Sequence, residues 1–130
     1  MSLKFYNIQN HGDAEKEFVL LQATADVNIH KYMIADRTFK ENGDLSNVHR
    51  HTFRFPSVDV KKGEFVVLFT KKGTPGTGKT TDGEKTYRFF WGSDAPFWND
   101  KNVEQAELLE VNTVAKLTLN TQDRKLAVKK

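Results

Sequence analysis

The 130-residue sequence contains no cysteine, so it can form neither a disulfide nor a thiolate metal site. It has no apolar run close to the ~20 residues that a membrane-spanning helix needs. Residues 1–7 include no long apolar segment typical of a secretory signal. No internal repeat is evident. These absences argue against a disulfide scaffold, a membrane span and a repeat array. The cytoplasm is the default compartment for such a chain if no signal has been cut from it.

What is present is a globular balance of 28% charged and 38% hydrophobic residues. A chain of this length is most simply one domain, residues 1–130, and folding buries roughly two-thirds of its unfolded surface. Net charge is +3, and near the chain end only Asp123 opposes a set of basic residues: Lys116, Arg124, Lys125, Lys129 and Lys130. Dedicated nucleic-acid binders show denser basic patches with interleaved aromatics, so a solvated tail is the simpler reading.

Residues 51–70 show the folding pattern most plainly. Polar and apolar residues alternate over 51–55, the period of a strand with one buried face, and Pro56 ends it. Residues 58–63 have turn composition. Residues 64–70 are apolar on both faces after Glu64, which predicts a central strand between two layers. Three side chains are expected to face the shared core: Phe53, Val67 and Phe69.

The remaining segments favour short strands separated by turns. Strands are expected at 4–8, 17–22, 27–29, 32–35, 85–92, 114–119 and 126–128, with a turn at 120–123. Polar loops are expected over 39–48 and 71–84. Residues 103–111 are ambiguous, because they contain good helix formers but lack a full helical stripe. About eight strands and no convincing long helix predict an all-β sandwich or barrel.

One motif matches a nucleotide-binding pattern letter for letter. Residues 73–80 read GTPGTGKT, the P-loop signature, in which glycine amides wrap phosphates and a lysine reaches them at a helix N-terminus. Turn residues and then a β-prone segment follow, so no helix is expected to begin between Gly78 and Thr81. Alternating βα units are also missing. We therefore interpret the segment as a flexible connection between two strands.

Other candidate sites are weaker. His49 and His51 would share one strand face, but no third metal ligand can be placed beside them. Acidic pairs at Asp36 with Glu41, and Asp94 with Asp100, are expected in loops where nothing fixes a catalytic spacing. Tryptophans 91 and 98 could form an exposed aromatic patch, although core anchors are the more usual role.

Several phrases, taken in order, resemble the lamin-tail domain, an immunoglobulin-like module of intermediate-filament tails and bacterial proteins. They are EFVLL at 17–21, VNIHKYMIAD at 27–36, HTFRFP at 51–56, KGEFVV at 62–67, FWG at 90–92 and PFWND at 96–100. Lys31 and Tyr32 stand where the family usually has Gly-Trp, and KNVE at 101–104 replaces its usual Gly-Asp turn. The resemblance implies a sandwich without catalytic residues that binds proteins and sometimes nucleic acid.

We therefore expect an all-β, immunoglobulin-like, two-sheet antiparallel β-sandwich of about eight strands. Its core would span about 15–112, and residues 113–130 would add a hairpin and basic tail. The expected function is a non-enzymatic structural or interaction module that binds a protein partner through loops or a sheet edge. The alternative is weak polyanion or nucleic-acid binding. No cofactor, metal, membrane contact or small-molecule substrate is expected. The candidate contact residues are Lys71, Lys72, Lys79, Trp91 and Trp98.

Overall fold

The computed structural model describes residues 2–39, 45–98 and 104–119. In these ranges the chain forms ten strands, eight of them four residues or longer, and one short 3₁₀ helix, Ile29–Lys31. The strands assemble into sheets of five, three and two strands. The all-β class and the sandwich architecture are thus confirmed. None of the described residues forms a helix long and apolar enough to cross a membrane.

The larger sheet has the strand order β1-β2-β7-β9-β8. Its strands are β1 (Leu3–Gln9), β2 (Phe18–Ala23), β7 (Phe65–Phe69), β9 (Lys85–Phe90) and β8 (Gly76–Lys79). The central strand β7 pairs antiparallel with β2 and parallel with β9. This one parallel pair arises because β8 reverses the chain on the far side of β9 before β9 enters the sheet.

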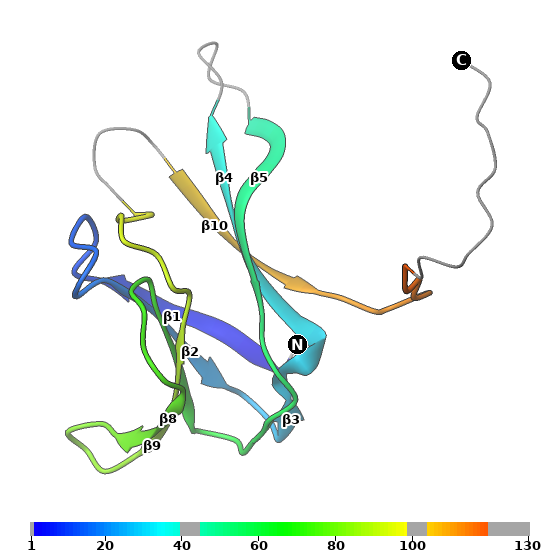
Figure 1. The fold of residues 1–130 in the computed structure, drawn as a ribbon. Coiled ribbons are helices and arrows are strands. Elements are labelled where there is room, and N and C mark those ends of the chain that lie inside the picture. Colours follow the sequence, from blue (N-terminus) through cyan, green and yellow to red (C-terminus); the bar gives the residue numbers. More distant parts are fainter. Residues whose placement is uncertain (1, 40–44, 99–103, 120–130) are drawn as a thin grey trace, which may run out of the picture.

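The second sheet has the order β10-β4-β5 and is antiparallel throughout. Its strands are β4 (Tyr32–Phe39), β5 (Leu45–Arg54) and β10 (Glu104–Glu110). A two-residue pair, β3 (Val27–Asn28) with β6 (Asp59–Val60), joins the ends of the two layers. Figure 1 shows this sheet beside the five-stranded one, and residues 111–119, after β10, running away from both.

The core lies between the two larger sheets. Side chains from β2, β4 and β7 form one buried cluster that includes Val19, Leu21, Tyr32, Ile34, Val66 and Leu68. Each such side chain contributes roughly 1.5–3 kcal/mol by leaving water. Leu3 of β1 is fully buried in the same cluster. The core therefore begins before residue 15, the start expected from the sequence.

The inward face of β7 differs from the prediction by one residue. Val66 and Leu68 point into the core and are fully buried, while Phe65, Val67 and Phe69 lie on the outer face of the sheet. The expectation that Val67 and Phe69 face the shared core is therefore wrong. Both faces of this strand are apolar, so the sequence pattern does not indicate which side chains point inward. Phe53 does pack against the core.

Several other expectations need correction or fall outside the described residues. Strand β5 begins at Leu45, so residues 45–48 are not loop, and β8 interrupts the loop expected over 71–84. Residues 104–110 form a strand, which settles the ambiguity at 103–111. The strand expected at 114–119 is not formed; those residues are exposed and outside every sheet. The turn at 120–123 and the strand at 126–128 lie outside the described residues, as do Glu41 and Asp100.

Candidate binding site

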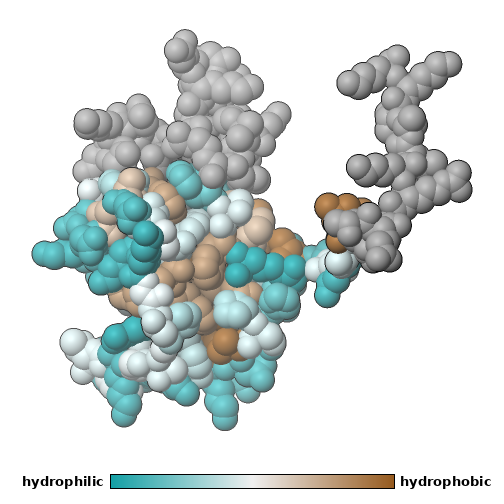
Figure 2. Space-filling view, viewed as in Figure 1, coloured by the Kyte–Doolittle hydropathy of each residue, from teal (hydrophilic) through white to brown (hydrophobic). Residues whose placement is uncertain are grey.

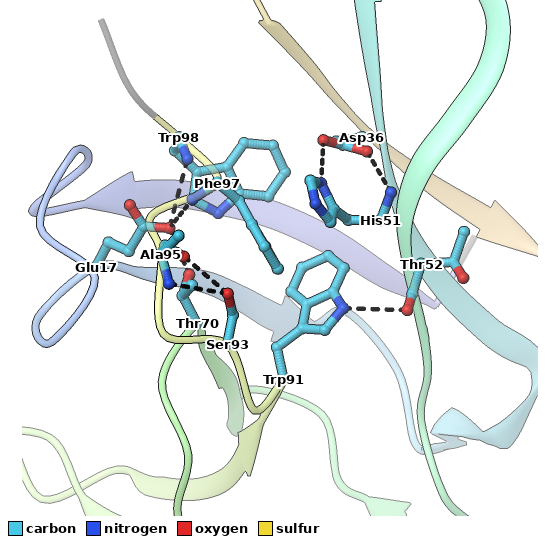
Figure 3. A network of polar contacts seen from close by, with 10 residues as sticks. All are labelled: Glu17, Asp36, His51, Thr52, Thr70, Trp91, Ser93, Ala95, Phe97 and Trp98. Carbon is cyan, nitrogen blue, oxygen red and sulfur yellow. Dashed lines mark hydrogen bonds and ion pairs between the residues drawn. The ribbon is translucent and has the colours of Figure 1, made fainter.

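A fully buried carboxylate ties the N-terminal part of the larger sheet to the segment after β9. Glu17 accepts hydrogen bonds from the backbone amides of Gly12 (3.1 Å), Phe97 (2.8 Å) and Trp98 (3.4 Å), and from the hydroxyl of Thr70. Figure 3 shows the carboxylate beneath residues 97 and 98. A buried carboxylate is tolerated when its lone pairs are filled in this way. The role of Glu17 is therefore structural: it fixes where residues 97 and 98 lie.

A second buried acid orients a histidine at the other sheet. Asp36 of β4 is fully buried and accepts from both the backbone amide and the Nδ1 of His51, each at 2.7 Å. The imidazole stacks on the Phe97 ring, with centroids 3.8 Å apart. The expectation of Asp36 in a loop is wrong, because it lies within a strand. The hydrogen bond from the His51 ring to Asp36 and the stacking of that ring on Phe97 together hold the segment around residue 97 against β5 (Figure 3). The role of His51 is therefore structural.

The two tryptophans do not form an exposed patch. Trp98 is only 5% exposed and belongs to the core cluster, so it offers no contact surface. Trp91 is half-buried, lies edge-on to Phe97 and donates its indole N–H to the Thr52 carbonyl across the gap between sheets. Large aromatic surface is stabilised most by burial, and this fold buries it. Both side chains act mainly as core anchors.

The outer face of the five-stranded sheet carries a groove that we name the outer groove. Its apolar floor is formed by β2 and β7 side chains, namely Phe18, Leu20, Val67 and Phe69. One part, about 380 Å³, also touches Lys79, Thr86 and Arg88. The other part, about 500 Å³, is lined by Tyr6, Phe65, Asp82 and Glu84. Leu20 and Thr80 line both parts, so the two parts adjoin on this face of the sheet.

The three candidate lysines have different surroundings. Lys72 forms an ion pair with Asp94 at 3.5 Å, and the Lys71 ammonium lies over the Phe69 ring. Lys79 lines the outer groove and pairs in register with Lys85 across β8 and β9. Like charges directly opposite each other on two strands are unfavourable. Of the three, Lys79 is the one that combines an adjacent positive charge with an apolar depression.

Residues 73–80 do not have P-loop geometry. Gly76–Lys79 form strand β8, paired antiparallel with β9, and Thr80 enters a turn closed by Glu84. No helix begins between Gly78 and Thr81, in agreement with the prediction. The expectation of a flexible connection is wrong at Gly76–Lys79, because this stretch is hydrogen-bonded to β9 as the edge strand of the larger sheet. A phosphate-wrapping turn needs a following helix N-terminus, which this described segment lacks.

The chain after β10 is the second exposed apolar feature. Val114, Leu117 and Leu119 are 92%, 96% and 91% exposed, far more than other large apolar side chains of the described residues. We name residues 113–119 the tail segment. Figure 2 shows its brown apolar atoms standing apart from the body of the molecule. Its start is fixed by hydrogen bonds from Val111 to Lys31 and from Arg54 to Thr113.

Other histidines and acids do not assemble a metal site among the described residues. His30 contacts the Phe55 carbonyl through Nδ1, and Asp94 lies exposed beside Lys72. The sequence-based reasoning did not single out Glu17 as a buried anchor. Its position at the start of an apolar run was the one available signal.

The comparisons with known proteins add no relative. No family model, no curated protein and no solved structure matches this chain.

Proposed function

We propose that this chain is a non-enzymatic interaction module that binds a protein partner by pairing the tail segment with a strand of that partner. The observation that carries the proposal is the exposure of Val114, Leu117 and Leu119 on a segment outside every sheet. Water-exposed apolar residues on an extended segment gain free energy when a partner covers them. Added strands are a common mode of peptide recognition, with main-chain hydrogen bonds supplying affinity.

The side-chain pattern of the tail segment suits this role. Leu117 and Leu119 are two residues apart and fall on one face of an extended strand, whereas Val114, Lys116 and Thr118 fall on the other, which is the more polar face. One face can therefore insert into a partner while the other stays in water. The two buried acids, Glu17 and Asp36, support the non-enzymatic reading, because their described contacts all serve the fold.

The resemblance to the lamin-tail domain belongs to the same proposal. The ordered phrases at 17–21, 27–36 and 51–67 support it, together with the sandwich that those segments build. The phrase at 96–98 contains the two residues whose amides Glu17 binds, and the phrase at 90–92 precedes it. A scaffold that presents partner-binding segments from a sandwich is the role that such a relationship implies.

The first test uses two double variants of the whole chain as bait. We expect Leu117→Ser with Leu119→Ser to lose a partner that wild-type protein retains, and Lys116→Gln with Thr118→Ser to keep it. The partner is then purified and its Kd measured against all three proteins. Losing both leucines should weaken binding by about tenfold or more, which is 1.4 kcal/mol. Equal affinity for the leucine variant, or substrate turnover by the purified chain, would contradict the proposal.

A second candidate function, weak polyanion binding, is favoured by one observation: Lys79 and Lys85 face each other in register. An anion between them would relieve their repulsion. Mobility shift of a single-stranded oligonucleotide over a salt series tests this. Counterion release requires that affinity fall steeply with salt, and Lys79→Gln should reduce the slope by about one. A salt-independent shift would exclude this candidate.

A further inference from the structure

We propose that the outer groove binds a single-chain amphipathic carboxylate, with the acyl chain on the apolar floor and the carboxylate held by Thr86 and Arg88. This site lies on the five-stranded sheet, away from the tail segment, and goes beyond the protein-binding function. It also revises the expectation that no small molecule is bound.

The floor of the groove is built for an apolar chain. Phe18 of β2 and Phe69 of β7 are paired in register with ring centroids 5.4 Å apart, and Leu20 pairs with Val67 beside them. On the next strand pair, Phe90 stacks on Phe69 at 5.2 Å. The two parts of the depression, about 380 and 500 Å³, are of the size that holds small ligands. An acyl chain lying across these strands would remove their outer faces from water.

One end of the groove presents hydrogen-bond donors that no described residue uses. Thr86 is 95% buried, since only 5% of its surface is exposed, and its hydroxyl has no hydrogen-bond partner among the described residues. A buried hydroxyl without a partner is costly, so a ligand oxygen that accepts its proton would be favoured. Thr86 is one of the residues that line the groove, so this buried hydroxyl lies at the groove wall.

The Arg88 guanidinium lies beside the backbone pair that contains Thr86. Gly78 pairs directly with Thr86, and a β-carbon added at Gly78 would collide with the Arg88 guanidinium. The guanidinium has therefore turned from its own position along the strand toward the Thr86–Gly78 pair. It makes no hydrogen bond or ion pair with a described residue. A guanidinium fork beside a hydroxyl matches the two oxygens of a carboxylate.

The charges of the groove set the direction of the ligand. Lys79 and Arg88 line the end that contains Thr86. The opposite part is lined by two acids, Asp82 and Glu84, and by one lysine, Lys62. A carboxylate at the acidic end would be repelled. The head therefore belongs at the Arg88 end, and the chain runs toward Leu20, which both parts share.

The experiment measures octanoate, decanoate and dodecanoate by calorimetry and by amide chemical shifts, below the concentrations at which they form micelles. We expect affinity to rise by up to about fourfold for each added CH₂. The shifts should be largest at residues 18–20, 67–69 and 86–88. Decanol should bind at least about tenfold more weakly than decanoate, because it lacks the charge that Arg88 binds.

Three variants separate a ligand site from a merely structural one. Arg88→Gln should weaken decanoate binding about tenfold or more, and Thr86→Val several-fold. Lys85→Gln is the matched control, since its ammonium lies over the Tyr87 ring and Lys85 lines neither part of the groove, and it should change affinity less than twofold. Thr86→Val should leave the urea midpoint unchanged or raised, because the hydroxyl it removes is unpartnered.

Four results would overturn the inference: no decanoate or dodecanoate binding, equal binding of decanol, shifts confined to other surfaces, or binding seen only above micelle formation. An unaffected Kd in Arg88→Gln would also overturn the assignment of the head. None of these outcomes depends on the tail segment, so the protein-binding proposal and this one can fail separately.

Discussion

Among the acidic residues that the structure describes, Glu17 accepts hydrogen bonds from the largest number of separate segments. Its carboxylate joins the turn at Gly12, the end of β7 at Thr70 and the amides of residues 97 and 98. Each of these donors would lose an acceptor if the charge were removed, and charge-assisted bonds contribute about 1.5–3 kcal/mol each. The residue is therefore a single point at which the sandwich can be weakened.

Replacing Glu17 by Gln tests that role. The amide NH₂ would face backbone N–H donors in place of one carboxylate oxygen, so we expect a loss of at least about 3 kcal/mol in the free energy of unfolding. Urea denaturation followed by tryptophan fluorescence measures it. Glu15→Gln is the matched control, because Glu15 is exposed, and should stay within about 0.5 kcal/mol. Equal stability of the two variants would show that the Glu17 network contributes little.

At the level of single elements, alternate side chains of β7 point to opposite faces of the sheet, one facing the core and the other facing the outer groove. Leu68 is fully buried against the second sheet, whereas Phe69 lies half-buried on the outer face. We expect Leu68→Ala to cost about 2–5 kcal/mol. Phe69→Ala should cost less than half as much, although the side chain is larger. Denaturant titration of both variants shows which set of β7 side chains faces the core. A greater loss of unfolding free energy in Phe69→Ala than in Leu68→Ala would mean that Phe69, and not Leu68, faces it.

The turn that enters β7 depends on one glycine. Gly63 has φ +89°, donates its amide to the Ala23 carbonyl and precedes Glu64, whose carboxylate accepts from Lys61 N–H. A β-carbon at Gly63 meets no neighbour, so only the backbone conformation opposes a substitution. Gly63→Ala should cost about 1–2 kcal/mol. Gly76→Ala, equally open but without positive φ, should change stability within about 0.5 kcal/mol; thermal unfolding compares them.

Some of these elements could be predicted from the sequence and others could not, for physical reasons. Strands β1, β2 and β9 have β-branched and aromatic residues bounded by turn residues, and they were located. Strand β8 is built of glycine, threonine and lysine, which carry no apolar period, and β10 uses the helix formers Glu, Gln, Ala and Leu. The outer groove was invisible, because it arises from strand order, which places residues 18, 67 and 86 together.

For the molecule as a whole, the tail segment is separate from the stability of the sandwich. Its apolar side chains make no buried contact with the body. Leu117→Ser with Leu119→Ser should therefore leave the free energy of unfolding in urea within about 0.5 kcal/mol of wild type, even though we expect it to weaken partner binding. A clear loss of stability would mean that these leucines pack on the sandwich in solution, and the strand-pairing proposal would fail with it.

The hydrogen bonds of Glu17 also determine how much of the chain must be synthesised before the sandwich can form. Residue 17 lies 80 positions before Phe97, whose amide it binds, and β10 pairs with β4 from a similar distance along the sequence. At ribosomal rates, 80 residues take ~4–16 s to synthesise. During that interval the first strands exist with the Glu17 carboxylate still open to water and their inner faces uncovered. The nascent protein therefore spends seconds as an incomplete sheet, and the sandwich closes only after residues 97–110 have been made.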